Sequence, residues 1–269
     1  MSNYEEMVVI FLDVLGSKEI RGFNEKFKIH QIFHQELKEN ENRQNTQAKK
    51  NVIYTRKIFS FSDCAFIFYK YKSDIDKSRK NINNLLITAL FNTSLTILKI
   101  TNEGYLIRGG VTYGEAYFDD LSFFGPAVER AYLIESKKAL FPRVLIDSNF
   151  GKKLFNYNKK IKENNFGKKS KYYHFLPKRT YIPSEIIQDK NEFILNFLYI
   201  LEQEGHLDFY GKNLKYNDVI NVIKQTISRN KEKHQNNDKI IQKLEWMNNY
   251  IQASKLSLEN EIDNVTFMV

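Results

Sequence analysis

The first strong pattern in the sequence is a continuous apolar run, MVVIFLDV, at residues 7–14. A short apolar run bounded by turn residues predicts a strand that is buried on both faces. The run carries one acid, Asp13, near its end, and Gly16 follows at once. A helical pattern then extends from residue 17 to about residue 37, whereas residues 38–51 have no periodicity and are interpreted as a loop.

The next segments alternate between strand and helix patterns. Residues 52–71 hold two strand-like runs with Ser62 and Asp63 at their junction, which predicts a hairpin with an acid at its tip. Apolar residues recur at helical spacing through residues 81–100, and residues 105–118 return to strand character. The remaining predicted elements are a helix at 124–138 with Pro126 in its first turn, a short strand at 143–146, a basic loop at 152–171, a last strand at 193–198, and polar helical segments at 216–229 and 238–254.

Strands and helices that alternate around one sheet predict the α+β class. The order of the elements favours a ferredoxin-like split βαβ core, with a mixed or antiparallel sheet and flanking helices. We expect residues 1–200 to form the main domain and residues 201–269 to form a helical C-terminal extension. Apolar residues make up 42% of the 269 residues, which is ample material for such a core.

Composition indicates a cytoplasmic protein. The single cysteine, Cys64, excludes a disulfide within the chain and a cysteine-rich zinc site, and it fits a reducing compartment. No run approaches the ~20 apolar residues that a membrane-spanning helix needs. The N-terminus carries Glu5 and Glu6 instead of a basic flank, so it does not resemble a secretion signal. We therefore expect no membrane partner.

The net charge of +9 is concentrated in one segment. Residues 137–179 contain thirteen Lys or Arg against two acids, which is an excess of +11. This segment is either a solvated lysine-rich surface or a site for an anionic partner. No nucleic-acid motif accompanies it. A nucleic-acid-binding module would predict salt-sensitive duplex binding that survives Asp13→Ala and Asp63→Ala.

Two aspartates are the main candidates for chemistry. A lone carboxylate at Asp13 is costly in a buried strand unless it is paired or binds a metal. Together with Asp63 on a neighbouring strand, it would suit a pair of Mg²⁺ ions, which prefer oxygen ligands and keep substrate phosphates as partners. Alternatively, Asp13 caps the following helix and Asp63 is a turn residue.

Phosphate-binding features surround these aspartates. Gly16 and Ser17 lie between a strand and a helix, where backbone N–H groups favour an anion, although an ordinary turn would have the same residues. Arg108 precedes Gly109 and Gly110, and glycines let a ligand or another backbone come close. Arginine grips phosphate with two donors, but Arg108 could also lie on the surface of its strand.

Four segments, in order, resemble class III nucleotidyl cyclases: FLDVLGSKE (11–19), FSDCAFIFY (61–69), LIRGGVTYGEAYF (106–118) and FFGPAVERAYLIE (123–135). They look most like the bacterial pyrimidine (uridylate or cytidylate) cyclases of Pycsar anti-phage defence. The resemblance covers roughly residues 7–147. It implies the class III cyclase fold and a cytoplasmic lyase that makes cUMP or cCMP as a second messenger.

The resemblance also implies roles for individual residues. Asp13 and Asp63 match the two metal-binding aspartates, which hold two Mn²⁺ or Mg²⁺ ions, and Val14 matches the position whose carbonyl touches a metal. Gly16 and Ser17 match the turn that faces the phosphates, and Arg108 matches an arginine that meets the triphosphate. Phe11 lies nearby on the strand, and Phe59 takes the base-reading position. The substrate-binding residues implied are Phe11, Gly16, Ser17, Phe59 and Arg108. The family works as a head-to-tail homodimer whose subunits share the active sites.

Departures from the purine cyclases bear on the substrate. Their base-reading lysine corresponds to Phe59, and their second base-reading residue falls near Ser122. A phenylalanine and a serine cannot form an adenine-recognising pair, so we expect a pyrimidine substrate, UTP or CTP. A purine (ATP or GTP) cyclase with unusual base contacts remains the alternative.

The catalytic helix also departs from the family. The Asn and Arg that stabilise the transition state correspond to Glu129 and Leu133. The adjacent Arg130 is our catalytic candidate, because it could reach the charge that builds on the phosphate. It could equally pair with Glu129 or Glu135 on the surface, and Tyr132 is a further candidate. A catalytically inactive cyclase-fold protein that binds a nucleotide is therefore a second alternative.

Overall fold

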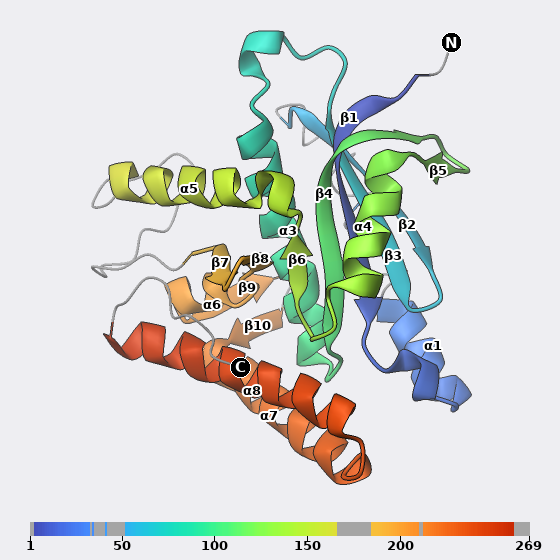
Figure 1. Ribbon diagram of the computed structural model, residues 1–269, viewed down its shortest axis with the longest axis vertical. Helices are drawn as coiled ribbons and strands as arrows, with labels where there is room; N and C mark the ends of the chain where they lie inside the picture. Colours follow the sequence, from blue (N-terminus) through green and yellow to red (C-terminus); the bar gives the residue numbers. More distant parts are fainter. Residues whose placement is uncertain are drawn as a thin grey trace. The chain divides into compact units, whose positions relative to one another are not determined.

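The computed structural model describes residues 3–32, 34, 41, 52–165, 184–209 and 212–260 (Figure 1). The chain folds as two compact units, one formed by Met1–Ala89 with Leu106–Asp147 and the other by Leu90–Tyr105 with Ser148–Val269. Both combine helices and strands, so the chain belongs to the mixed α+β class, as predicted. The boundaries of these units differ from the expected division at residue 200. The division into a catalytic domain and a C-terminal extension stays a prediction.

The first unit holds the sheet on which the candidate site lies. Its strands are β1 (Glu5–Val14), β2 (Tyr54–Phe61), β3 (Cys64–Tyr71), β4 (Ile107–Phe118), β5 (Phe123–Phe124) and β6 (Val144–Ile146). Its helical segments are η1 (Ser17–Glu19), α1 (Phe23–Gln31), η4 (Lys77–Arg79), α4 (Pro126–Lys137) and the beginning of α3 (Ile82–Asn102).

Strand β1 lies at the centre of this sheet, whose order in the first unit is β2-β3-β1-β4-β6. Pairing is antiparallel except between β4 and β6, and β5 adds to β4. The apolar run predicts this place, because residues 7–12 are almost completely buried and β1 is paired on both sides. The elements expected in this unit are confirmed: the strands at 7–14, 105–118 and 143–146, the hairpin at 52–71 and the helices at 81–100 and 124–138.

Helix α4 packs unusually close to β4. A Cβ placed on Gly110 would lie 2.5 Å from the carbonyl oxygen of Ala131 and 2.9 Å from Cβ of Ile134. A Cβ on Gly109 would lie 2.4 Å from the carbonyl oxygen of Phe11. Gly109 and Gly110 therefore allow the backbone of neighbouring elements to come close to β4. This is one of the two roles that the sequence left open, the other being the approach of a ligand.

The helix expected from residue 17 is wrong in its first part. A 3-10 turn, Ser17–Glu19, is followed by extended backbone at Ile20 and Gly22, and α1 begins only at Phe23. The helical pattern at the start of this segment therefore corresponds to a single 3-10 turn and not to the beginning of α1. The expected loop at 38–51 lies outside the described residues, except for Glu41.

The second unit is built mainly from helices. Besides the rest of α3 it contains α5 (Ser148–Asn165), β7 (Ile186–Asp189), β8 (Glu192–Leu195), α6 (Tyr199–Glu204), β9 (His206–Phe209), β10 (Lys212–Lys215), α7 (Tyr216–Lys233) and α8 (Asp238–Asn260). The helices expected at 216–229 and 238–254 are confirmed. The expected helical extension also contains an antiparallel hairpin, formed by β9 and β10, which was not predicted. The strand expected at 193–198 ends at Leu195, and its partner β7 was not predicted.

The basic loop expected at 152–171 is also wrong, because α5 occupies most of it. Gly151, Leu154 and Asn158 are buried at helical spacing, while the lysines of the first turns are exposed. The lysines therefore lie on the exposed face of an amphipathic helix, and it was their run in the sequence that was interpreted as a loop. Residues 166–171 lie outside the described part of the chain.

Helix α3 has the length and composition of a membrane-spanning helix, and it is the one such helix among the described residues. We expected no segment of this kind. However, 67% of its most apolar window is buried within the protein, as in a core helix.

Candidate functional site

The candidate site begins where β1 ends. Asp13 pairs in register with Cys64 of β3 and with Arg108 of β4. Arg108 donates from Nε and from Nη2 to Oδ2 of Asp13, and both distances are 3.0 Å. Asp13 caps no helix, because Gly16 and Gly22 precede the two helical segments that follow. The capping alternative is therefore wrong, and Asp13 is held by an ion pair with Arg108.

A second carboxylate, Glu135, approaches Arg108 from α4. Its side chain is 3% exposed, and its Oε1 lies 2.7 Å from Nε of Arg108. The single hydrogen of Nε is aligned with Asp13, so the contact with Glu135 is a charge contact and not a second hydrogen bond. Arg108 thus lies between two acids instead of on the open surface of its strand.

Burial and charge set the proton affinities of the two acids. Burial raises the pKa of Glu135 to about 7; the charge of Asp13 adds to this, and Arg108 opposes it. The pKa of Asp13 is also raised, mainly by burial, with Arg108 lowering it and the charge of Asp63 raising it. Asp13 and Asp63 are therefore close enough for their charges to interact.

Asp63 stands at the tip of the β2–β3 hairpin, after Ser62, which has the left-handed φ of 51°. The carbonyl oxygen of Asp63 accepts a hydrogen bond of 3.1 Å from the backbone N–H of Val14. Its carboxylate oxygen Oδ2 accepts a hydrogen bond from the hydroxyl of Ser17. The hairpin tip is thereby tied to the end of β1 and to the turn that follows it.

The Gly16–Ser17 turn has a fixed shape. Gly16 adopts a left-handed φ of 80° and precedes η1, and the N–H of Leu15 donates to the carbonyl oxygen of Leu106 over 2.8 Å. Ser17 is 2% exposed, and its hydroxyl is already used by Asp63. The turn therefore positions Asp63.

Cys64 lies among these acids but is not a nucleophile. Burial, with further contributions from Asp13, Asp63 and Glu135, raises the pKa of its thiol to about 12. Its Sγ lies 3.3 Å from the carbonyl oxygen of Phe61 as a donor. The thiol stays protonated, and it packs as a small apolar group.

Aromatic rings cover the sheet next to Asp13, on the face that α4 packs against. Phe11 packs on Phe66 with tilted rings whose centroids are 4.5 Å apart, and Phe66 lies 4.8 Å from Phe123. Phe59 lies 4.7 Å from Phe123 and is only partly buried. Tyr132 of α4, which is 51% exposed, meets Phe11 edge-on at 5.7 Å. Phe11 is thus a core residue beneath the site, and Phe59 lies in a ring cluster at its side.

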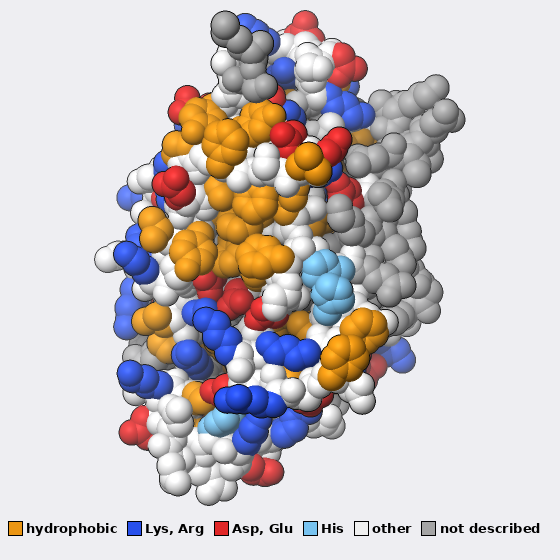
Figure 2. All heavy atoms as spheres, turned by 90° about the vertical axis from the view of Figure 1, so that its right-hand side faces the viewer, with side chains coloured by type: hydrophobic (Ala, Val, Ile, Leu, Met, Phe, Trp, Pro, Cys, Tyr) orange, Lys and Arg blue, Asp and Glu red, His pale blue; other side chains and the backbone are white. Residues whose placement is uncertain are grey.

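Hydrophobic side chains also gather on the surface. Figure 2 looks at the side of the molecule that carries α4, β2 and β3, and it shows a large central patch of these side chains with smaller groups apart from it. Exposed aromatic and aliphatic residues of β5 and α4 include Phe124 at 52% and Leu133 at 43%. An apolar surface of this kind is typical of a site that binds another molecule.

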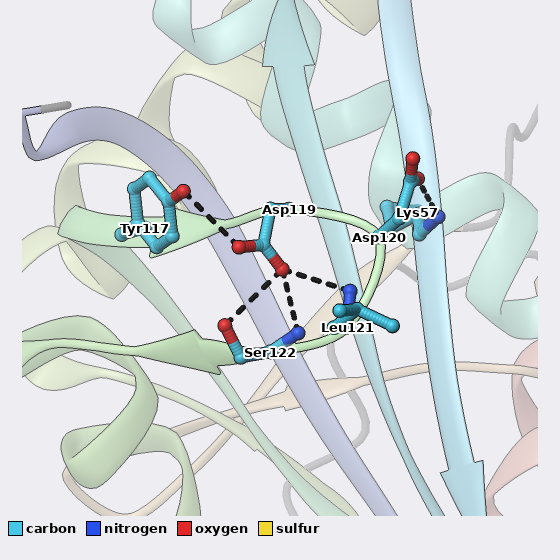
Figure 3. A network of polar contacts seen from close by, with 6 residues as sticks. All are labelled: Lys57, Tyr117, Asp119, Asp120, Leu121 and Ser122. Atoms are coloured by element: carbon cyan, nitrogen blue, oxygen red, sulfur yellow. Dashed lines mark hydrogen bonds and ion pairs between the residues drawn. The ribbon is translucent and has the colours of Figure 1, made fainter.

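The β4–β5 turn contains the residue that corresponds to a base-reading position. The hydroxyl and the N–H of Ser122 both donate to Oδ1 of Asp119, at 3.1 and 2.7 Å (Figure 3). Tyr117 donates to the other oxygen of Asp119 at 3.2 Å. Asp120 forms an ion pair of 2.8 Å with Lys57. The polar groups of Ser122 are therefore used by the turn itself.

Arg130 does not pair with either acid expected for it. Its Nη1 lies 3.5 Å from Oδ2 of Asp147, and Glu135 faces Arg108 instead. Glu129 is exposed on α4. The expected pairings were wrong because Glu135 lies on the buried stripe of α4 with Val128 and Ala131. An acid on such a stripe is the signal that could have revealed Glu135 as a site residue.

The donor set bears on whether a metal fits here. Among the described residues, no group of three or more His, Cys, Asp or Glu could hold a metal ion by itself. Asp13 and Asp63 provide two carboxylates, which is the number that Mg²⁺ takes when phosphates and water supply its other ligands. The residues therefore fit cations that arrive with a triphosphate, and not a permanent all-protein metal cage.

No protein-family model matches this sequence, and no curated protein matches it. The solved structures that resemble it include the crystal structure of the catalytic core of a rhodopsin-guanylyl cyclase with converted specificity in complex with ATPαS. The sequence identity is 17%, the match covers 55% of this chain and 80% of that chain, and the TM-score is 0.38. A similarity at this level carries no weight for function, so the functional case rests on the site.

Proposed function

We propose that this chain is a nucleotide cyclase, a lyase that converts a nucleoside triphosphate into its 3′,5′-cyclic monophosphate and pyrophosphate. The observation that carries the proposal is the meeting of Asp13, Asp63 and Arg108 at one end of the sheet, beside the Gly16–Ser17 turn. Two carboxylates and a guanidinium are suited to hold cations and a triphosphate. The segments that resemble class III nucleotidyl cyclases contain these residues, which supports the class III fold with its split βαβ core.

The chemistry uses these residues to hold and orient the substrate. Two bound Mn²⁺ or Mg²⁺ ions would supply charge neutralisation and a lowered pKa of the ribose 3′-hydroxyl. Asp13 and Asp63 would hold the ions, with the carbonyl of Val14 as a further ligand. The 3′-oxygen bonds to the α-phosphorus, the bond from that phosphorus to the α–β bridging oxygen breaks, and pyrophosphate leaves with this oxygen. The hydroxyl proton passes to solvent.

Two arginines contribute positive charge. Arg108 turns from Asp13 toward the triphosphate, and the Gly16–Ser17 turn faces the same phosphates. Arg130 is our candidate for the charge that develops on the α-phosphate, because its side chain is 40% exposed and its ion-pair contact with Asp147 is long, at 3.5 Å.

We further propose a pyrimidine substrate, UTP before CTP. Phe59 stands in the ring cluster where a purine cyclase has its base-reading lysine. The polar groups of Ser122, at the second base-reading position, are used by Asp119. A partly buried ring beside the site can stack on a base, whereas neither residue offers the donor and acceptor pair that adenine needs.

The assembly and cellular role follow from the resemblance. We propose a cytoplasmic homodimer whose two sites lie between the subunits, and the apolar patch in Figure 2 supports such an interface. We also propose that the cyclic pyrimidine nucleotide is a second messenger in anti-phage defence. Phage plating on cells that carry the wild-type chain or Asp63→Ala tests this role, since protection must depend on Asp63.

The decisive experiment is incubation with each of the four labelled nucleoside triphosphates and Mn²⁺. We expect a cyclic monophosphate and pyrophosphate from UTP or CTP. Asp63→Asn, which keeps the size of the side chain, must reduce product formation by at least about a hundredfold. Asp74→Asn is the matched control, because Asp74 is exposed and lies in a loop away from the site.

Each other outcome selects an alternative. Faster turnover of ATP or GTP than of UTP and CTP would replace the pyrimidine substrate with a purine. Metal-dependent nucleotide binding without any product would make the chain a catalytically inactive nucleotide-binding protein. Duplex binding that survives Asp13→Ala and Asp63→Ala would favour a nucleic-acid-binding module.

A further inference from the structure

The contacts of Arg108 raise a question about the site before substrate arrives. Both aligned donors of Arg108 point to the same oxygen of Asp13. That carboxylate is also the one assigned to the cations. The guanidinium therefore occupies one oxygen of a carboxylate that would bind a cation, so that cation and guanidinium would compete for the charge of Asp13.

Glu135 is the second anchor of the same guanidinium. The side chain of Arg108 is 21% exposed and that of Asp13 is 19% exposed, whereas that of Glu135 is 3% exposed. A buried carboxylate needs a compensating cation, because it has lost its hydration. Oε1 of Glu135 accepts no hydrogen bond in the described part of the chain. Arg108, at 2.7 Å, is the ion-pair partner of this oxygen within the described residues, and the charge of Lys18 adds a smaller attraction.

The backbone keeps this arrangement in place. Arg108 lies on β4 directly beside Asp13, and β4 is held between β1 and β6. Glu135 lies on α4, which Gly110 allows to pack against β4 at minimal distance. The two acids therefore stand on fixed elements, and the part that can move is the long side chain of Arg108.

We propose that Glu135 is a positioning residue for Arg108, which it holds beside Asp13 in the metal-free protein and retains near the site when a divalent cation takes Asp13. The inference rests on the proposed nucleotide cyclase function. Arg108 neutralises Asp13 until a divalent cation arrives. Once displaced, Arg108 stays anchored at Glu135, from which it reaches the phosphates instead of swinging into solvent.

The test measures Mn²⁺ binding to the full chain without nucleotide, by the loss of the free-Mn²⁺ electron paramagnetic resonance signal. Arg108→Gln removes the competing cation and should tighten Mn²⁺ binding by roughly fivefold. Glu135→Gln leaves Arg108 paired with Asp13 alone, and it should weaken Mn²⁺ binding by roughly fivefold. Glu115→Gln, the same change at an exposed position of β4, should leave it unchanged.

The double variant separates positioning from other roles. If Glu135 acts through Arg108, adding Glu135→Gln to Arg108→Gln should change the Mn²⁺ affinity by less than about twofold. An equal loss in both backgrounds would show that Glu135 acts on the metal directly, and it would overturn the proposal. Unchanged Mn²⁺ affinity in both single variants would also overturn it. Circular dichroism confirms folding, and Glu135→Asp, which keeps the charge but shortens the side chain, replaces Glu135→Gln if that variant does not fold.

A second measurement reports on the nucleotide. With Mn²⁺ and a non-hydrolysable UTP analogue, Glu135→Gln should weaken analogue binding at saturating Mn²⁺, because Arg108 has lost its anchor. Mn²⁺ binding that is insensitive to Asp13→Ala, together with absence of cyclic product, would refute the cyclase function itself. Cyclic product from the wild type with unaltered Mn²⁺ and analogue binding in the Glu135 variants would refute only the positioning role.

Discussion

Replacing Gly110 by alanine tests the close packing that places Glu135 beside Arg108. The added Cβ would lie 2.5 Å from the carbonyl oxygen of Ala131 and 2.9 Å from Cβ of Ile134. Ordinary van der Waals contact begins near 3.4 Å, so the two contacts are too short by about 0.9 and 0.5 Å. Strand β4 cannot yield, because Gly110 is paired with Phe11 on one side and Leu145 on the other.

Helix α4 must therefore move away from the sheet by close to 1 Å. Overpacking of this kind costs about 1–3 kcal/mol, and backbone contacts place Gly110→Ala toward the upper end. The same shift carries Glu135 away from Arg108, since both the clash and the ion pair depend on the position of α4. We expect the variant to lose stability and to bind Mn²⁺ more weakly, as Glu135→Gln does.

Urea unfolding followed by circular dichroism measures the loss of stability. Gly22→Ala is the matched control, because Gly22 has a φ of −70° and open space around its Cβ position. Gly22 is the N-cap of α1, where alanine is less favourable than glycine, so this control should cost about 0.5–1 kcal/mol, which is less than Gly110→Ala. A Gly110→Ala protein as stable as the control would refute the packing of α4 on β4, and with it the geometry on which the role of Glu135 depends.

Three further predictions concern buried groups. The pKa of Glu135 is about 7 in the folded chain against an ordinary value of 4.5, so the folded state binds more protons between these values and stability should fall as pH rises from 4.5 to 7. The loss is at most roughly 3 kcal/mol; urea unfolding at several pH values should show a flatter profile for Glu135→Gln, and equal profiles would contradict the assignment. The thiol of Cys64, with its pKa raised to about 12, should react with iodoacetamide at pH 8 far more slowly in the native chain than in urea, and equal rates would refute its burial. Tyr250→Phe should cost about 1–3 kcal/mol in urea unfolding, because the buried hydroxyl donates to Asn196 at 2.5 Å and accepts from the N–H of Leu198 at 3.2 Å; a neutral effect would show that this network does not stabilise the second unit.

Local patterns were sufficient for much of the first unit. An uninterrupted apolar run predicted a central strand at β1, and two short runs around Ser62 and Asp63 predicted the β2–β3 hairpin. These features depend on neighbours within a few residues, which the sequence displays directly. The prediction failed at α5, where the run of exposed lysines was interpreted as a loop although the buried residues recur at helical spacing.

Pairing across the chain was less accessible. The sequence offered Glu129 and Glu135 as equal partners for Arg130, because all three lie on one predicted helix. The structure pairs Arg130 with Asp147 and turns Glu135 toward Arg108. Which acid pairs with which arginine depends on the face of α4 that meets the sheet. That face is set by the close contact between Gly110 of β4 and Ala131 of α4, which lie on two separate elements.

By itself, the sequence determined that Asp13 ends a buried strand and that Asp63 ends a hairpin, because both follow from short runs of apolar residues. Only the tertiary structure decided what surrounds them. Arg108 is 95 residues from Asp13 along the chain, and sheet pairing places it alongside. Glu135 reaches the same guanidinium from a helix that packs on that sheet. A carboxylate's partners are chosen by packing over such separations, since burial and charge act through space and not along the chain.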